Sequence, residues 1–384
     1  MTKLAQPLEV GIAHRYFGLD LVRALAIILV MLAHTLPGGH TWEAVRTLRY
    51  FLGYFGVEIF FLLSGFLIGG ILLKNLSEDR FRSPTDLVSF WKRRWFRTLP
   101  NYYLFLLVEF IVALCVSGAL PPEAPHFLWF GQALWWSDPD FFGASWSLAI
   151  EEWFYLLFPV CLLALAQVVR NRQKAAILCI LVFLIVPPLL RSLLQTDDWD
   201  GSVRRITLPR LDAITYGVAL AFLRDFRLPA WKFLLKCWPV GLVATVGLAG
   251  WWIQSARHDN PAHLFLFRVL FFSFTSISLA LWFPWMAERQ AAANTFARIV
   301  RNLSLWSYSL YLTHTTFGGI IVNIFHHFGW SIYKANAVII SACVWATSLP
   351  TSAFLYRYFE KPIMDLREKR SPKTKVAGVR LTNP

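Results

Sequence analysis

Leu19-Asp-Leu-Val-Arg-Ala-Leu-Ala-Ile-Ile-Leu-Val-Met-Leu-Ala-His34 is an apolar run that contains an arginine, Arg23, and ends on a histidine. The run predicts an α-helix, in which both side chains share one face, roughly 16 Å apart along the axis. Intramembrane charge is costly and usually faces a polar interior, so we expect a polar tunnel lined by both residues. In the alternative, Arg23 snorkels or pairs with Asp20, and His34 is an interfacial residue.

The whole chain has the composition of a membrane protein. Its 384 residues are 57% hydrophobic and include 18 Trp and 33 Phe, and the mean hydropathy is +0.49. The net charge of +14 is compatible with nucleic-acid binding. The basic residues, however, cluster between apolar runs, which favours a role in membrane orientation. We therefore expect membrane lipids and no nucleic acid among the partners.

Hydropathy predicts an all-α, polytopic integral membrane protein with about ten transmembrane helices. The sixth predicted span is short, and the seventh contains Pro239. We expect a cytoplasmic segment over 1–18, a membrane domain over 19–358 and a basic cytoplasmic tail over 359–384. The ten predicted spans are 19–36, 50–73, 101–120, 147–168, 175–191, 211–224, 231–253, 264–286, 303–325 and 335–356.

The distribution of Lys and Arg predicts the orientation. With both termini in the cytoplasm, the cytoplasmic segments carry 27 of these residues and the opposite side carries 9. Cytoplasmic loops of membrane proteins are enriched in Lys and Arg. This bias supports an even number of spans, with His34 toward the outside and Arg23 nearer the cytoplasm.

A basic, aromatic-rich cluster, Trp91-Lys-Arg-Arg-Trp-Phe-Arg-Thr-Leu-Pro100, directly precedes the third predicted span on its cytoplasmic side. Arg94 and Arg97 are three residues apart and share a helical face. Guanidinium groups bind phosphates in a bidentate manner, so the cluster suits a polyanionic, ring-bearing ligand such as a nucleotide or coenzyme A. The alternative is flanking charge that contacts anionic lipids.

Paired carboxylates, Glu151 and Glu152, follow Ser145 at the outer end of the fourth predicted span. Adjacent helical residues point about 100° apart, so we expect only one carboxylate to face a given cavity. It could orient His34, pair with an arginine or act as a base. The structural alternative is an ion pair with an arginine such as Arg210.

Weaker signals are Arg210 and Asp212 at the start of the sixth predicted span, and His314 in Ser307-Tyr-Ser-Leu-Tyr-Leu-Thr-His314. We take these three as candidate substrate-binding residues. The remaining histidines lack ligand spacing, so no metal site is expected.

Taken together, these segments resemble the acyltransferase-3 family of integral membrane acyltransferases. The resemblance follows the chain nearly end to end and rests on six motifs in order. They are Gly18-Leu-Asp-Leu-Val-Arg23 with His34, Phe60-Phe-Leu-Leu-Ser-Gly-Phe-Leu-Ile68, Arg93-Arg-Trp-Phe-Arg-Thr-Leu-Pro100, Trp146-Ser-Leu-Ala-Ile-Glu-Glu-Trp-Phe-Tyr-Leu157, Ser307-Tyr-Ser-Leu-Tyr-Leu312 with His314, and Phe359-Glu-Lys-Pro362.

The resemblance implies transfer of an acyl group, most often acetyl, from cytoplasmic acyl-CoA to a hydroxyl of an extracytoplasmic carbohydrate or glycolipid, such as O-antigen or exopolysaccharide. It implies a bacterial cytoplasmic (inner) membrane location and acyl-CoA as co-substrate, with no permanently bound cofactor. The family's essential histidine maps onto His34, and its arginines map onto Arg23, Arg94 and Arg97. We expect a stand-alone member without a C-terminal esterase-like domain.

The expected mechanism places His34 as general base, because an unperturbed imidazole titrates near pH ~6.5. In the alternative, His34 carries the acyl group as a nucleophile. Arg94 and Arg97 would bind the phosphates of coenzyme A, and Arg23 would guide the pantetheine arm or polarise the thioester. The competing function is a transporter or flippase of a sugar or lipid, but the chain lacks the internal repeat that is usual in that class.

Overall fold

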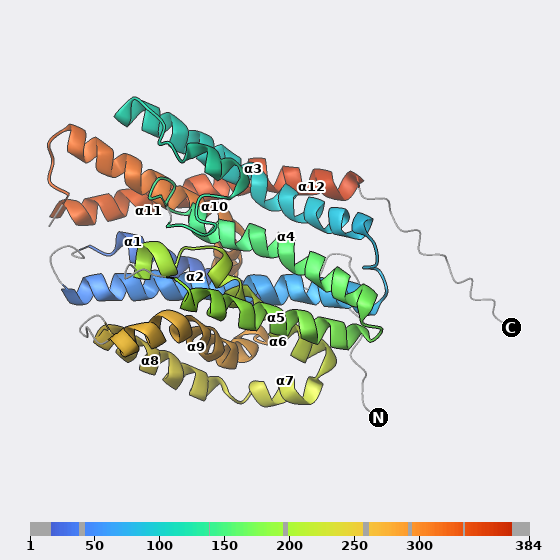
Figure 1. Ribbon diagram of the computed structural model, residues 1–384. Helices are drawn as coiled ribbons and strands as arrows, with labels where there is room; N and C mark the ends of the chain where they lie inside the picture. The colour runs from blue at the N-terminus through green and yellow to red at the C-terminus, as the bar shows by residue number, and fades with distance from the viewer. Residues whose placement is uncertain are drawn as a thin grey trace.

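The computed structural model describes residues 17–37, 43–137, 139–194, 199–255, 261–290, 294–332 and 335–370. Most of the expected cytoplasmic segment 1–18 and of the basic tail 359–384 lies outside these ranges. Over the described residues the chain folds into helices joined by loops, as predicted (Figure 1). The helices are α1 (Phe17–Thr35), α2 (Glu43–Ser77), α3 (Pro84–Ser117), α4 (Ser145–Val168), α5 (Arg172–Ser192), α6 (Asp212–Phe226), α7 (Leu228–Leu234), α8 (Trp238–Ser255), α9 (Pro261–Ala287), α10 (Thr295–His327), α11 (Ala335–Leu355) and α12 (Lys361–Arg370).

Seven helices in the described part of the chain are long and apolar enough to cross a membrane. The number rises to eight if α7 and α8 form one span, which is bent by 59° at the break between them. The protein is therefore an integral, multi-pass membrane protein. The remaining two predicted spans correspond to α6, which has 15 residues, and to α10, which carries many buried Ser and Thr residues. A count of ten spans stays a prediction.

The third predicted span differs most from the observed helix. The sequence places the arginine cluster ahead of a span that begins at residue 101, but α3 begins at Pro84 and contains the whole cluster. At 1.5 Å per residue, its 34 residues extend over about 51 Å, which exceeds the roughly 30 Å hydrocarbon core. Arg94 and Arg97 therefore belong to a continuous helix that extends past the core at one end or both.

The long helices lie side by side, with α2 packed between α1 and α6 (Figure 1). Glycines allow the closest approach in this layer. A Cβ atom at Gly65 would lie 1.8 Å from the carbonyl oxygen of Ile214, and one at Gly217 would lie 2.0 Å from that of Leu62. Because no side chain fits there, the backbones of α2 and α6 touch directly, as small residues permit in membrane helix pairs.

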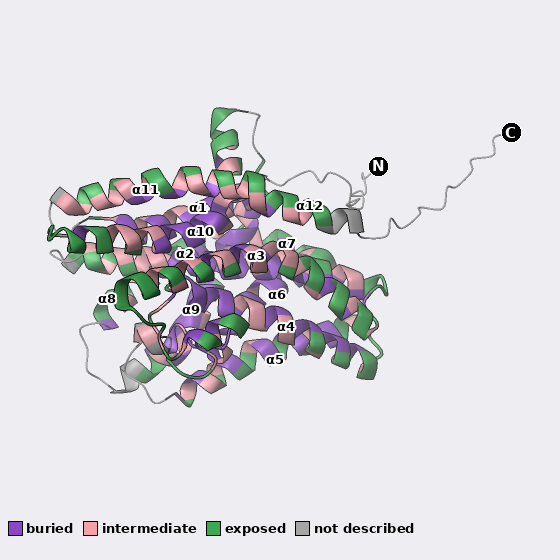
Figure 2. Ribbon diagram, turned by 90° about the horizontal axis from the view of Figure 1, so that it is seen from above, coloured by how far each residue is buried: buried purple, intermediate pink, exposed green. Residues whose placement is uncertain are grey.

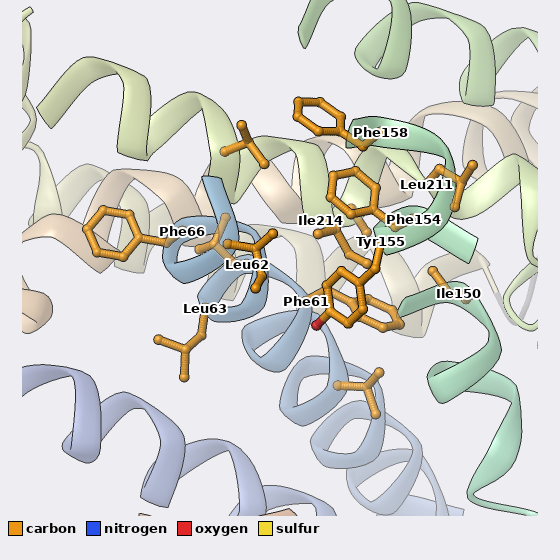
Figure 3. Packing of buried hydrophobic residues seen from close by; sticks show 14 of the residues in the cluster. Phe61, Leu62, Leu63, Phe66, Ile150, Phe154, Tyr155, Phe158, Leu211 and Ile214 are labelled. Carbon is orange, nitrogen blue, oxygen red and sulfur yellow. The ribbon is translucent and has the colours of Figure 1, made fainter. Parts of the chain in front are cut away.

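The packed interior is built largely from aromatic and aliphatic side chains. Phe61 of α2 and Phe154 of α4 lie on the side of Ile214 in this cluster, whereas Phe66 of α2 points away from them (Figure 3) and packs against Trp231 and Phe283. Buried residues gather along α1, α2 and α10, whereas α11 at the edge is largely exposed or intermediate (Figure 2). The central helices α1, α2 and α10 are thus the fixed frame on which polar side chains can be held inside the bundle.

Candidate functional site

Two neighbouring cavities lie inside the helix bundle. The first, which we call the Arg94 cavity, has a volume of about 100 Å³. The second, which we call the His34 cavity, has a volume of about 240 Å³. Polar residues of the Arg94 cavity are Arg23, Ser64, Arg94, Arg97, Thr98, Ser147, Glu151, Tyr155, Ser307, Tyr308 and Tyr311. Those of the His34 cavity are His34, Arg46, Arg49, Tyr50, Arg204, Arg205, Tyr311, His314 and Thr315.

The three predicted arginines meet in the Arg94 cavity, although they come from α1 and α3. Arg23 faces this cavity while its Nη1 donates to Ser304 Oγ at 3.5 Å. Ser304 in turn donates to Asp20 Oδ1 at 2.6 Å, so a serine of α10 links the two charged residues of α1. The observed arrangement brings three guanidinium groups to one cavity, which suits a phosphate-bearing ligand.

One of the two predicted carboxylates also reaches the Arg94 cavity. Glu151 lines it and accepts a hydrogen bond from the hydroxyl of Tyr155 at 3.1 Å. The guanidinium of Arg94 lies 5.0 Å from the centroid of the Tyr155 ring. Glu152 lines neither cavity and accepts a hydrogen bond from Thr98 Oγ1 at 2.8 Å. The expectation that only one carboxylate faces a given cavity agrees with this arrangement.

His34 lies in the last turn of α1 and has another histidine as its neighbour. Nδ1 of His34 lies 3.3 Å from Nε2 of His314 on α10, and the rings meet edge to face with centroids 4.9 Å apart. Neither Glu151 nor Glu152 lines the His34 cavity. The residue placed to orient His34 is therefore His314, which the sequence suggested only as a substrate contact.

Hydrogen bonds to the backbone assign the tautomers of the two rings. His314 Nδ1 lies 3.0 Å from the carbonyl oxygen of Leu310, so this nitrogen carries the proton. His314 Nε2 is then an acceptor that faces His34 Nδ1, which also lies 2.9 Å from the carbonyl oxygen of Val30. His34 Nδ1 must therefore carry its own proton, which leaves Nε2 of neutral His34 with a free lone pair.

The two cavities share part of their walls. Val57 of α2 and Tyr311 of α10 line both. The hydroxyls of Tyr311 and Ser147 are hydrogen bonded at 2.6 Å, and Ser147 lines the Arg94 cavity. Val57 and Tyr311 thus form a shared part of the walls of the two cavities.

Two further predicted residues lie in buried ion pairs away from both cavities. Asp212 accepts a bidentate bond from Arg191, with both N–O distances at 2.8 Å. Arg210 pairs with Glu58, and neither Arg210 nor Asp212 lines a described cavity. The suggested pair between Arg210 and Glu151 or Glu152 does not form. These contacts join α5, α6 and α2, and they point to a structural role for Arg210 and Asp212 instead of a substrate contact.

Comparison with known proteins identifies the family. The model of the acyltransferase-3 type, described as an acyltransferase domain, matches residues 16–357. The chain belongs to the acyltransferase-3 family. The matched range contains His34, Arg94, Glu151 and His314, so both cavities lie within the family domain.

Similarity to individual members of the family extends over only part of the chain. The chain is 31% identical over 229 residues to the peptidoglycan O-acetyltransferase OatA of Listeria monocytogenes. It is 30% identical over 220 residues to a Staphylococcus aureus protein provisionally named as an O-acetyltransferase. Each match covers 54% of this chain and 34% of the relative, so the chain aligns with about a third of the length of these curated relatives. No solved structure matches the chain.

Glu360 is a buried residue that we did not single out among the candidates. Its Oε2 accepts hydrogen bonds from Ser309 at 3.0 Å and from Asn101 at 3.2 Å. Asn101 lies one helical turn after Arg97 on α3, so Glu360 is held beside the helix that carries this arginine of the Arg94 cavity. The available signal was the Phe359-Glu-Lys-Pro362 motif, which supports the resemblance but does not assign Glu360 a position near Arg97.

Proposed function

We propose that this protein is a membrane O-acyltransferase that transfers an acyl group, acetyl in the first instance, from cytoplasmic acyl-CoA to a carbohydrate hydroxyl outside the cytoplasm. The host membrane would be a bacterial cytoplasmic membrane. The observation that carries the proposal is the adjacency of the two cavities, one with three arginines and one with a histidine oriented as a base. Membership of an acyltransferase family and the similarity to named O-acetyltransferases support it.

The donor would enter by the Arg94 cavity. Arg94 and Arg97 would bind phosphates of coenzyme A, since guanidinium groups match phosphate oxygens in pairs. The volume of about 100 Å³ is too small for the whole coenzyme but suits part of its narrow pantetheine arm. Arg23 would guide the pantetheine arm, and the phosphates would remain at the cytoplasmic end of α3.

The acceptor would enter the His34 cavity, where Nε2 of His34 removes the proton of the attacking hydroxyl. The hydroxyl oxygen then forms a bond to the acyl carbon, the thioester C–S bond breaks, and the thiolate of coenzyme A takes up the proton that His34 removed. While His34 is protonated, its Nδ1–H still donates to Nε2 of His314, which keeps the ring of His34 in place. Glu151 would help to position Tyr155 and the arginines of the Arg94 cavity. Arg210 and Asp212 would have a structural role, since their ion pairs link neighbouring helices.

The test is release of coenzyme A from labelled acetyl-CoA, measured with the purified protein in lipid nanodiscs to which membrane glycolipids of the host are added. We expect coenzyme A release to be matched by formation of ester-linked acetate on the glycolipid fraction. Acetyl-CoA that stays intact while labelled glycolipid crosses the membrane of proteoliposomes would instead support a transporter or flippase.

A further inference from the structure

The His34 cavity holds an unusual concentration of positive charge. Arg46 and Arg49 come from the first turns of α2, and Arg204 and Arg205 come from the segment that precedes α6. All four line the same cavity as His34. Among the described residues, no Asp or Glu belongs to its wall.

Two of these arginines already have roles that fix their positions. Arg49 Nε donates to the carbonyl oxygen of Ala33 at 2.7 Å, so it holds the end of α1 on which His34 stands. The guanidinium of Arg204 lies 4.8 Å from the centroid of the Trp146 ring. Arg49 and Arg204 are thus held in place at the wall of the cavity.

Arg205 has a partner that water can replace. Its Nη1 lies 3.1 Å from Oδ1 of Asp140, a carboxylate whose side chain is 86% exposed, whereas the side chain of Arg205 is only 17% exposed. An ion pair with so exposed a carboxylate contributes little stability. An anion inside the cavity would interact with Arg205 in a less polar environment and therefore more strongly. Arg46 is exposed on α2 and adds a fourth positive charge.

We propose that the acceptor bears a carboxylate or phosphate on the sugar that is acylated or on its immediate neighbour; this inference rests on the proposed function. Four guanidinium groups line one cavity, and an anionic ligand in that cavity would be attracted to all of them. The volume of about 240 Å³ is below the roughly 300–1,000 Å³ of typical ligand sites, so the cavity suits about one sugar unit. The anionic group and the reacting hydroxyl must therefore lie close together.

The experiment compares cells that make the wild-type protein with cells that make His34→Ala at equal membrane levels. Surface and lipid-linked glycans are cleaved to mono- and disaccharide units, separated by anion exchange and assayed for alkali-labile acetate. We expect the His34-dependent acetate on anion-retained units. Phosphatase treatment identifies the phosphate-bearing units, and carbodiimide reduction identifies those with a carboxylate. His34-dependent acetate on neutral units would overturn the inference and leave the proposed function standing. If no acetate depends on His34, the proposed function fails and the inference fails with it.

A second measurement separates an anionic acceptor from the phosphates of the donor. In isolated membranes supplied with the retained glycan units, Arg46→Gln and Arg205→Gln should each raise the KM for the glycan by about tenfold. The KM for acetyl-CoA should stay unchanged, and Arg205→Lys should recover part of the loss. Arg268→Gln, which changes an arginine of α9 outside both cavities, is the matched control. A rise in the KM for acetyl-CoA alone would assign these arginines to the donor and overturn the inference.

Discussion

Nε2 of His314 lies 3.3 Å from Nδ1 of His34, although 280 residues separate the two in the sequence. Each ring is also fixed by a backbone carbonyl one helical turn earlier, Leu310 for His314 and Val30 for His34. The pair thus places a free lone pair at Nε2 of His34, in the cavity that would hold the acceptor. Among the described residues, no carboxylate lines this cavity, although a carboxylate is the partner that usually orients a catalytic histidine.

Replacement of His314 tests this orienting role. His314→Ala should lower kcat roughly 10- to 100-fold, less than the factor of about 10⁴ that follows loss of an orienting carboxylate in a serine protease. The KM for acetyl-CoA should stay near the wild-type value. His314→Gln offers an amide oxygen to His34 Nδ1–H and should recover part of the rate. Equal kcat in the wild type and His314→Ala would show that His34 needs no partner.

The arginines of α3 should act on donor binding. Arg94→Lys and Arg97→Lys keep the charge but lose the bidentate fork, so each should raise the KM for acetyl-CoA by about 10- to 100-fold, given about 1.5–3 kcal/mol for a charged hydrogen bond. Arg93→Lys, an exposed neighbour outside both cavities, is the control. Steady-state kinetics with varied acetyl-CoA provide the measurement. An unchanged KM in both α3 variants would exclude phosphate contact by these residues.

Tyr311, which lines both cavities, should limit how much water from the His34 cavity reaches the thioester. Tyr311→Ala would join the two cavities, and we expect more acetyl-CoA hydrolysis for each ester formed. The ratio of coenzyme A released to glycan ester gives the measurement. Tyr308→Phe removes a hydroxyl on the Arg94 side, which donates to the carbonyl oxygen of Thr98 at 2.7 Å, and should leave the ratio unchanged. A ratio that stays at the wild-type value in Tyr311→Ala would argue against a separating role.

The ion pair between Glu58 and Arg210 should support stability and have no direct role in chemistry. Glu58→Ala leaves a buried guanidinium without its partner, which costs about 3–5 kcal/mol. The apparent melting temperature in detergent should therefore fall. The double variant Glu58→Leu with Arg210→Met removes both charges and should recover most of the loss. If the double variant melts as low as Glu58→Ala while it retains full transfer activity, the lost stability does not come from an unpaired charge.

Most of the helices could be predicted from the sequence, because an apolar run long enough to span a membrane has few structures open to it other than a helix. Each of the ten predicted spans coincides with a helix, including the seventh, which the structure breaks just before Pro239. The start of α3 was missed because its first residues are polar and charged, and hydropathy does not detect a helix outside the hydrocarbon core. A capping motif can mark such a helix end in the sequence, and Ser83 and Asp86 form a capping box at the start of α3.

The site was predicted only where its residues are close in the sequence. Arg94 and Arg97 share a face because they lie one helical turn apart, and Arg23 and His34 face neighbouring cavities on one helix. The partner of His34 depends on the packing of α1 against α10, which no local pattern contains. The same holds for the pairing of Arg210 with Glu58, since both are buried charges whose partner only the fold determines.

The most direct test of the role of His34 uses a host that makes the protein or its His34→Ala variant at matched membrane levels, with equal melting temperatures of the two purified proteins. The measured quantity is alkali-labile acetate on the surface glycan after growth on labelled acetate. We predict that the His34→Ala strain lacks the label, because loss of a general base lowers the rate by about 10²–10⁴. Labelled ester at the wild-type level in the His34→Ala strain would contradict acyl transfer at His34.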